Sequence, residues 1–206
     1  NLNGNTSQIF VNNNTLELKN IAVAGGDIYF SDSINSSIED SDLQSLEFYN
    51  SVVNIKNILT LTNEISVYNS TLTAQNILID GGGFLGDAIN VSNDGTLNII
   101  DSTVQNLATS GGGSGIVAYN NSTVNSDNVT LDGGSYGVTV FNNTDLDFQH
   151  GVIKNMATSG VTAFDGGSYT SSFTRVRYSE ISNNGNGFEF IMPVDIDIII
   201  NSIHDN

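Results

Sequence analysis

A short alternating pattern recurs along the chain: an apolar residue, any residue, an apolar residue, any residue, and then Asn or Asp. Alternation with a period of two predicts a β-strand that buries one of its faces. The copies lie 19, 18, 19, 24, 27, 22, 23 and 27 residues apart, which predicts a repeating structural unit that each copy opens. The copies begin at Ile9, Ile28, Leu46, Ile65, Ile89, Ile116, Val138, Val161 and Phe188.

A second alternating segment follows most copies after a short turn, as in Val53–Ile55, and a third apolar stretch often follows, as in Ile77–Ile79. Three short strands per repeat predict a β-solenoid, in which each coil buries its apolar side chains against its neighbours. We therefore expect an all-β fold, a right-handed parallel β-helix of about nine coils. Residues 1–206 are expected to form one such segment of a longer secreted or surface protein.

The Asn or Asp that closes each copy is predicted to occupy the same turn in successive coils. Asn tolerates the left-handed backbone conformation, and its amide can hydrogen-bond to an equivalent residue about 4.8 Å away. We interpret this series, and a second one after the second strand, as structural ladders. The first series is Asn13, Asp32, Asn50, Asn69, Asn93, Asn120, Asn142 and Asp165, and the second is Asn20, Asn57, Asn76 and Asn128.

Four glycine clusters are predicted to be loops that join coils. No Lys-Ser or Lys-Thr pair follows any of them, so they do not predict a phosphate-binding loop. They are Gly81–Gly86, Ser110–Gly115, Asp132–Gly137 and Asp165–Tyr169.

The chain is strongly acidic, with 22 Asp and Glu residues against five Lys and Arg and a formal net charge of −17. Such a surface repels phosphate backbones and anionic lipids, so nucleic acid is not an expected partner. No stretch of about 20 apolar residues predicts direct membrane insertion. The absence of Cys and the presence of only two His disfavour a transition-metal site. No cofactor is expected, with calcium as the one ion left open.

An outward column of aromatic residues is the first candidate binding feature. If the first and third residues of each copy point inward, the fourth points outward, which places Tyr49, Tyr68, Tyr119, Phe141 and Phe164 on one face. A row of exposed rings could stack on sugars or contact a protein. Alternatively, loops cover the rings, or the rings stack on each other and stabilise the sheet.

A charged column near the C-terminal end is a second candidate. Asp147, Arg175 and Asp197 are predicted to align at one outward position of consecutive coils, with Arg177, Asp195 and His150 close by. Carboxylates grouped around a basic residue could act in proton abstraction from a polysaccharide. The alternative is a cross-strand ladder of ion pairs on an acidic surface.

The coil pattern also carries a family resemblance, seen in residues 99–106 (IIDSTVQN), 132–143 (DGGSYGVTVFNN) and 176–187 (VRYSEISNNGNG). The chain resembles the right-handed parallel β-helix families, and is most similar to passenger domains of bacterial autotransporter adhesins of the self-associating and matrix-binding types. The resemblance covers nearly the whole chain and rests on periodicity, Asn and Gly content, absence of Cys and short coils.

The resemblance implies a non-enzymatic adhesin, secreted or held at the bacterial cell surface. Its implied partners are host glycans, extracellular matrix proteins, or like molecules on neighbouring cells. One alternative is a polysaccharide lyase or hydrolase of the pectate-lyase-like class that acts at the charged column. Another alternative is a structural stalk or a phage-type fibre segment.

Overall fold

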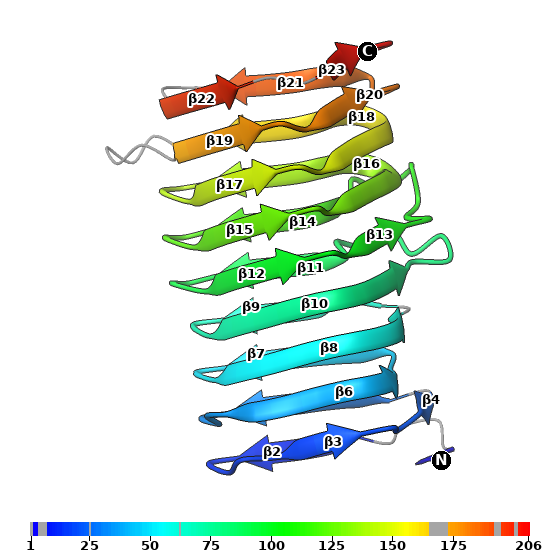
Figure 1. The fold of residues 1–206 in the computed structure, drawn as a ribbon, viewed down its shortest axis with the longest axis vertical. Helices are drawn as coiled ribbons and strands as arrows, with labels where there is room; N and C mark the ends of the chain where they lie inside the picture. The colour runs from blue at the N-terminus through cyan, green and yellow to red at the C-terminus, as the bar shows by residue number, and fades with distance from the viewer. Residues whose placement is uncertain are drawn as a thin grey trace.

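The computed structural model describes residues 2–3, 8–24, 26–61, 63–164, 173–191, 195–199 and 202–206. Every element in these ranges is a β-strand, and the strand pairs between coils are parallel. The strands stack as successive coils, with the two termini at opposite ends of the stack (Figure 1). The all-β parallel architecture predicted from the repeat is therefore confirmed.

Each coil contains an opening, a second and a third segment, and some strands span two of them. The opening strands are β2 (Ile9–Asn12), β5 (Asp27–Ser31), β7 (Ser45–Tyr49), β9 (Ile65–Tyr68), β11 (Ile89–Ser92), β14 (Ser114–Tyr119) and β21 (Asn186–Ile191). The second strands are β3 (Glu17–Lys19), β12 (Thr96–Ile100), β15 (Thr123–Asp127), β17 (Asp145–Gln149), β19 (Phe173–Arg177) and β22 (Asp195–Ile199).

The third strands are β4 (Val23–Ala24), β13 (Thr103–Gln105), β20 (Glu180–Ser182) and β23 (Ser202–His204). Strands β6 (Ser36–Asp42), β8 (Val52–Leu61) and β10 (Thr71–Asp80) each form a second and a third segment. Strands β16 (Thr130–Phe141) and β18 (Val152–Phe164) each form a third and an opening segment. At the N-terminal end, β1 (Leu2–Asn3) pairs with β4.

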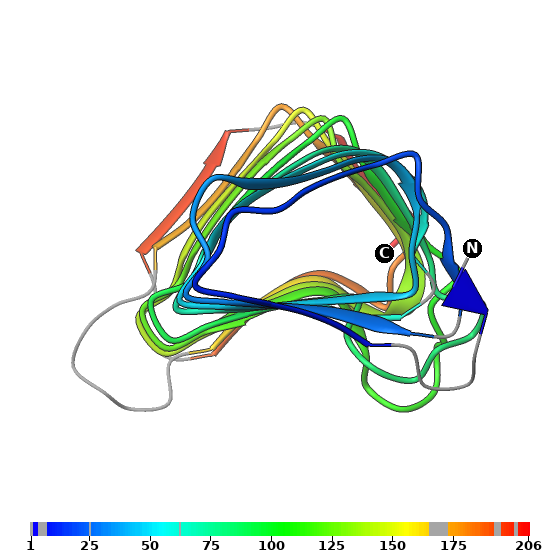
Figure 2. The ribbon, with the colours of Figure 1, turned by 90° about the horizontal axis from the view of Figure 1, so that it is seen from below.

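The opening segments pair in the register that the sequence pattern predicts. The Cα partners follow one another from coil to coil as Ile9, Ile28, Leu46, Ile65, Ile89, Ile116, Val138, Val161 and Phe188. Viewed along the stack, the sheet of opening strands bows toward the interior, whereas the other sides bulge outward (Figure 2).

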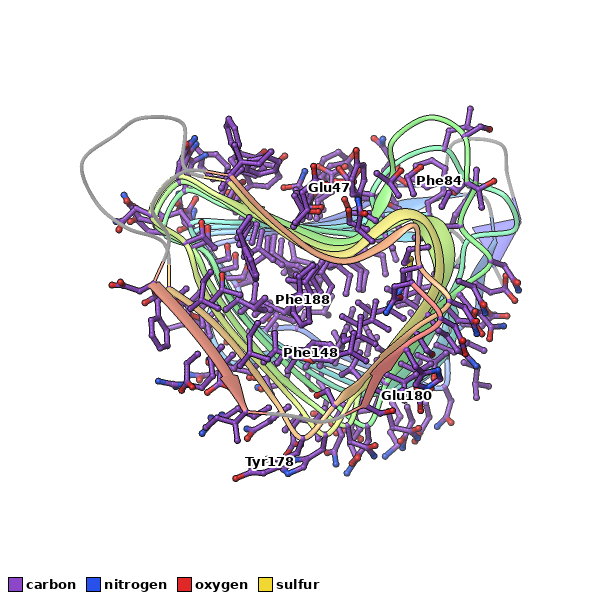
Figure 3. All side chains as sticks on the ribbon, turned by 90° about the horizontal axis from the view of Figure 1, so that it is seen from above. Glu47, Phe84, Phe148, Tyr178, Glu180 and Phe188 are labelled. Atoms are coloured by element: carbon purple, nitrogen blue, oxygen red, sulfur yellow. The ribbon has the colours of Figure 1, made fainter. Side chains whose placement is uncertain are left out.

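The interior of the stack is a continuous apolar core. Residues at the first and third positions of the opening strands point inward, and Phe30 and Phe48 stack there with ring centroids 5.4 Å apart. Figure 3 shows Phe148 and Phe188 in the same interior. Complete burial of one such side chain stabilises the fold by about 1.5–3 kcal/mol, so the inward residues of the alternating pattern are a main source of the stability of each coil.

The predicted Asn ladders are confirmed in the described coils. Asn50 and Asn69 have φ angles of 47° and 44°, in the left-handed region. The Asn69 amide donates to Asn50 Oδ1 at 2.8 Å, and the Asn76 amide of the second series donates to Asn57 Oδ1 at 2.8 Å. Asp165, the last predicted member of the first series, lies outside the described residues.

A buried ladder of serine side chains lies beside the first turn, and the sequence pattern did not predict it. The Ser51 hydroxyl accepts the backbone N–H of Ser33 at 3.1 Å, and the Ser70 hydroxyl accepts that of Ser51 at 2.9 Å. Each hydroxyl therefore satisfies a buried backbone donor of the preceding coil, which would otherwise be costly.

The predicted glycine loops are only partly correct. Residues 81–88 and 106–113 join strands as loops, but Asp132–Gly137 lies inside β16, so the loop prediction is wrong there. The register of β16 against β18 shifts between Gly134 and Tyr136, where the third segment passes into the opening segment, and Gly134 has a φ angle of 122°. A Cβ on Gly137, just after this irregularity, would collide with the Gly160 carbonyl oxygen and the Ile153 side chain, so the close packing there requires glycine. The cluster at 165–169 lies outside the described residues.

Candidate ligand-binding groove

The predicted aromatic column lies on the outward side of the opening sheet as two separate ring pairs. Tyr49 pairs in register with Tyr68, with ring centroids 5.6 Å apart, and both rings are about 40% exposed. Phe141 pairs with Phe164 in an edge-to-face arrangement at 5.8 Å. Ser92 lies between Tyr68 and the predicted Tyr119 and interrupts the column.

The second pair, Phe141 and Phe164, forms one wall of a groove of about 370 Å³. Ile191, the register partner of Phe164 in β21, extends this wall. Such a volume is in the range of about 300–1,000 Å³ that small ligands occupy. The remaining lining residues are Asp87, Gly112, Ser114, Val117, Tyr136, Thr139, Thr162 and Glu189.

The floor of the groove is an outward-facing column that is nevertheless buried. Val117, Thr139 and Thr162 occupy the second position of consecutive opening strands, which points away from the core. Their exposed fractions are only 7%, 5% and 7%. The Phe164 wall and the loop residues Asp87 and Gly112 stand beside this column and account for its burial.

The hydroxyls of Thr139 and Thr162 at the floor differ in their hydrogen bonding. Thr139 Oγ1 is hydrogen-bonded to Ser114 Oγ at 3.1 Å, whereas Thr162 Oγ1 is buried without a hydrogen-bond partner. A buried hydroxyl that makes no hydrogen bond costs about 1–3 kcal/mol. Thr162 therefore places an unsatisfied polar atom just beneath the floor of the groove, where a rotation of its side chain would bring the hydroxyl to a ligand.

Two carboxylates border the groove, and both are held in place by hydrogen bonds. Asp87, from the loop before β11, accepts the backbone N–H of Ser114 at 2.7 Å. Glu189 lies next to Thr162 in register and accepts the hydroxyl of the fully buried Ser159 at 2.8 Å. The groove thus combines an apolar wall, a hydroxyl floor and fixed negative charge.

The N-terminal part of the same face carries an exposed aromatic and acidic surface. Phe10 and Tyr29 stack at 5.0 Å, and the Tyr49 hydroxyl donates to Glu47 at 3.0 Å. Partial burial, followed by hydrogen bonding to Glu47, raises the pKa of Tyr29 to about 12. Burial also raises the pKa of Glu64. Figure 3 shows Glu47 on the outer side of the inwardly bowed sheet, on the same side as Phe84.

The charged column on the second strands forms the predicted register, with Asp147 paired to Arg175 and Arg175 to Asp197. Arg175 contacts Asp147 at 3.1 Å and Asp197 at 3.3 Å, and Arg177 contacts Asp147 at 2.7 Å. Hydrogen bonding to Asp147 raises the pKa of Arg175 further above its ordinary value. A proton-abstracting base requires a lowered pKa, so this geometry favours an ion-pair ladder over a catalytic base.

His150 lies at the turn after β17 and contacts Asp127 at 2.8 Å rather than the charged column. Its ring stacks on Tyr178 of the next coil at 5.5 Å. In the described part of the chain, no group of three or more His, Asp or Glu side chains is placed to hold a metal ion. The described ranges also contain no helix long and apolar enough to cross a membrane.

Sequence reasoning placed Phe141 and Phe164 on the outward face but missed Asp87, Thr162 and Glu189. The alternation that identified the fourth position as outward applies equally to the second position, which holds Thr162 and Glu189. Asp87 had no such signal, because it lies in a loop whose course depends on the neighbouring coil.

The chain matches no family model, no curated protein and no solved structure. What the groove binds therefore has to be argued from its own geometry and charge.

Proposed function

We propose that this chain is a non-enzymatic, glycan-binding segment of a secreted or cell-surface protein, built as a right-handed β-helix of about nine coils. The observation that carries the proposal is the groove, in which an aromatic wall faces a buried, unsatisfied Thr162 hydroxyl. The adhesin interpretation from the sequence agrees with this role, and self-association or matrix-protein binding through the same face are its competitors.

Sugar rings suit both surfaces of the groove. The C–H faces of a pyranose ring pack against aromatic rings, and Phe141 and Phe164 supply such a surface. The hydroxyl groups of the same ring both donate and accept, so one of them could satisfy Thr162 Oγ1. A purely apolar ligand would leave the Thr162 hydroxyl unpaired and would gain less from binding.

The exposed pair Tyr49 and Tyr68 is proposed as an extension of the same site along the stack. Both pairs lie on the opening sheet, and the coil spacing would place a long glycan across successive strands. An extended ligand of this kind would bind through a face rather than through a single pocket.

The test is isothermal titration with a panel of neutral, amino and acidic oligosaccharides. At least one member should bind, and Phe164→Ser should weaken that binding by about tenfold or more through loss of a stacking surface. Phe10→Ser is the matched control, because Phe10 is an outward phenylalanine of the same sheet that lies outside the groove. Equal losses in the two variants, or no binding across the panel, would contradict the groove as a glycan site.

The same panel, with and without added calcium, separates binding from catalysis. We expect no chain scission and no unsaturated product in either condition. Cleavage that Arg175→Ala abolishes would instead favour the polysaccharide lyase and would direct attention to Asp147 and Asp197.

A further inference from the structure

The distribution of charge over the molecule narrows the class of glycan. The five basic residues are Lys19 in β3, Lys56 in β8, Lys154 in β18, and Arg175 and Arg177 in β19. Each of them lies on a second or third segment, as their register partners show. The opening segments of the described coils therefore carry no Lys or Arg.

Acidic residues, by contrast, are present along the opening face. Asp27 and Glu47 lie on β5 and β7, Glu64 precedes β9, Asp87 precedes β11, and Glu189 lies on β21. Among these, Asp87 and Glu189 line the groove, and no basic residue does. The groove is thus negatively charged, and the rest of its face adds to that charge.

From these observations we propose that the groove binds a cationic amino sugar, such as an oligomer of unacetylated glucosamine, with ammonium groups of different rings at Asp87 and at Glu189. This inference rests on the proposed glycan-binding function and specifies its ligand class. The unsatisfied Thr162 hydroxyl is the second, independent sign that the groove takes a polar ligand.

The chemistry of such a ligand matches each part of the groove. A ring packs against Phe141 and Phe164, a hydroxyl pairs with Thr162, and the ammonium groups of separate rings form charge-assisted hydrogen bonds, one with each carboxylate. The hydrogen bond from Ser159 fixes Glu189, so little side-chain order has to be gained on binding. A uronate or sulfated glycan would meet only like charge.

A lysine-rich peptide would satisfy the same carboxylates but fits the remaining surfaces less well. A peptide could pair with Thr162 only through its backbone, and the flexible lysine stem loses more conformational freedom than a pyranose ring. The groove geometry therefore favours the amino sugar, and the peptide becomes one outcome of the test.

The test compares four probes by isothermal titration: a glucosamine tetramer, its N-acetylated counterpart, a galacturonate tetramer and tetralysine. The glucosamine tetramer should bind about tenfold more tightly than the acetylated one, because acetylation removes the ammonium charge. The uronate should not bind, and added salt should weaken the binding of the amine.

Three variants locate the charge that is responsible. Asp87→Asn and Glu189→Gln keep the shape and the accepting oxygen of each side chain, and each should weaken amine binding by about tenfold. Glu17→Gln on β3 removes the same charge from another face and should change it little. Thermal unfolding of each variant verifies that the fold persists.

Failure of the amino-sugar inference can be distinguished from failure of the proposed glycan binding. If the acetylated tetramer binds as tightly as the amine, the charge inference is overturned while glycan binding stands. If no sugar binds, both proposals fail together. Tighter binding of tetralysine than of the amine tetramer would overturn the amino-sugar assignment in favour of a basic peptide.

Discussion

The opening face and the second-strand face of this stack use charge in opposite ways. On the second strands, Asp147 and Asp197 are neutralised by Arg175 and Arg177 within the ladder. On the opening face, Asp87 and Glu189 border a groove without a basic partner in its lining, and Thr162 has no hydrogen-bond partner. The comparison teaches that carboxylates paired with Arg stabilise the stack, whereas the groove carboxylates have no basic residue in the same lining to neutralise them. Figure 3 shows Glu47 on the outer side of the opening sheet and Tyr178, at the turn after β19, on the opposite side of the stack.

The largest expected effect on stability comes from a substitution that disturbs the packing between opening segments of neighbouring coils. Gly137→Ala should lower the free energy of unfolding by about 1–3 kcal/mol, because the added Cβ meets the backbone of Gly160 in the next coil. Chemical denaturation followed by circular dichroism measures the loss. Gly86→Ala is the control, since the nearest atoms to its Cβ belong to the ring of Phe84, which can turn away, and it should cost less than about 0.5 kcal/mol. Equal losses would show that the packing at Gly137 is not tight.

An intermediate effect tests the second-strand face. Asp147→Asn removes the carboxylate shared by Arg175 and Arg177, and we expect a loss of about 1 kcal/mol of stability at low salt. The loss should shrink at high salt, because the surface pairs are screened. Asp197→Asn should cost less, because its contact with Arg175 is longer and more exposed.

Ligand affinity at the groove should be unchanged in both of these variants. If either variant changed ligand affinity as much as Glu189→Gln does, the proposed separation of roles between the two faces would be contradicted.

The smallest effect concerns titration on the opening face. The pKa of Tyr29 is raised to about 12, whereas the unfolded chain titrates near about 10. The folded protein thus retains the Tyr29 proton to a higher pH than the unfolded chain does. The free energy of unfolding therefore falls as pH rises between these two pKa values. Tyr29→Phe should remove that part of the fall, as followed by unfolding at successive alkaline pH values.

An ultraviolet titration of the phenolates provides the companion measurement. Glu47→Gln should move the Tyr29 titration to lower pH, because the carboxylate that opposes the phenolate becomes neutral. An unchanged titration curve would place Tyr29 outside the influence of Glu47.

The sequence was sufficient to predict the repeat and its register, because both follow from local alternation. The position of Ile89 between Ile65 and Ile116, and the left-handed backbone at Asn69, required no long-range information. The segment Asp132–Gly137 was misassigned as a loop, because a glycine cluster has the same composition in a loop and in an irregular strand.

The groove could be predicted only in part. Phe141 and Phe164 were placed correctly by the period of two, but the burial of Thr162 depends on neighbouring coils. Glu189 reaches its position through a strand pairing that spans almost 30 residues, as its contact with Ser159 shows. Whether an outward-facing residue is buried depends on several coils together, so the pattern within one coil cannot predict it.

The loops at 81–88 and 106–113 have a consequence for how this protein can diversify. They lengthen their coils at the corner before the opening strand, and the strands on either side keep their register, as in Leu72 with Leu97 and Ile89 with Ile116. Figure 2 shows green loops projecting from the outline of the stack. Changes in loop length or sequence would therefore alter the rim that supplies Asp87 and leave the core intact. Such a scaffold could acquire new ligand preferences by insertion at one corner, much as an antibody varies its loops on a constant frame.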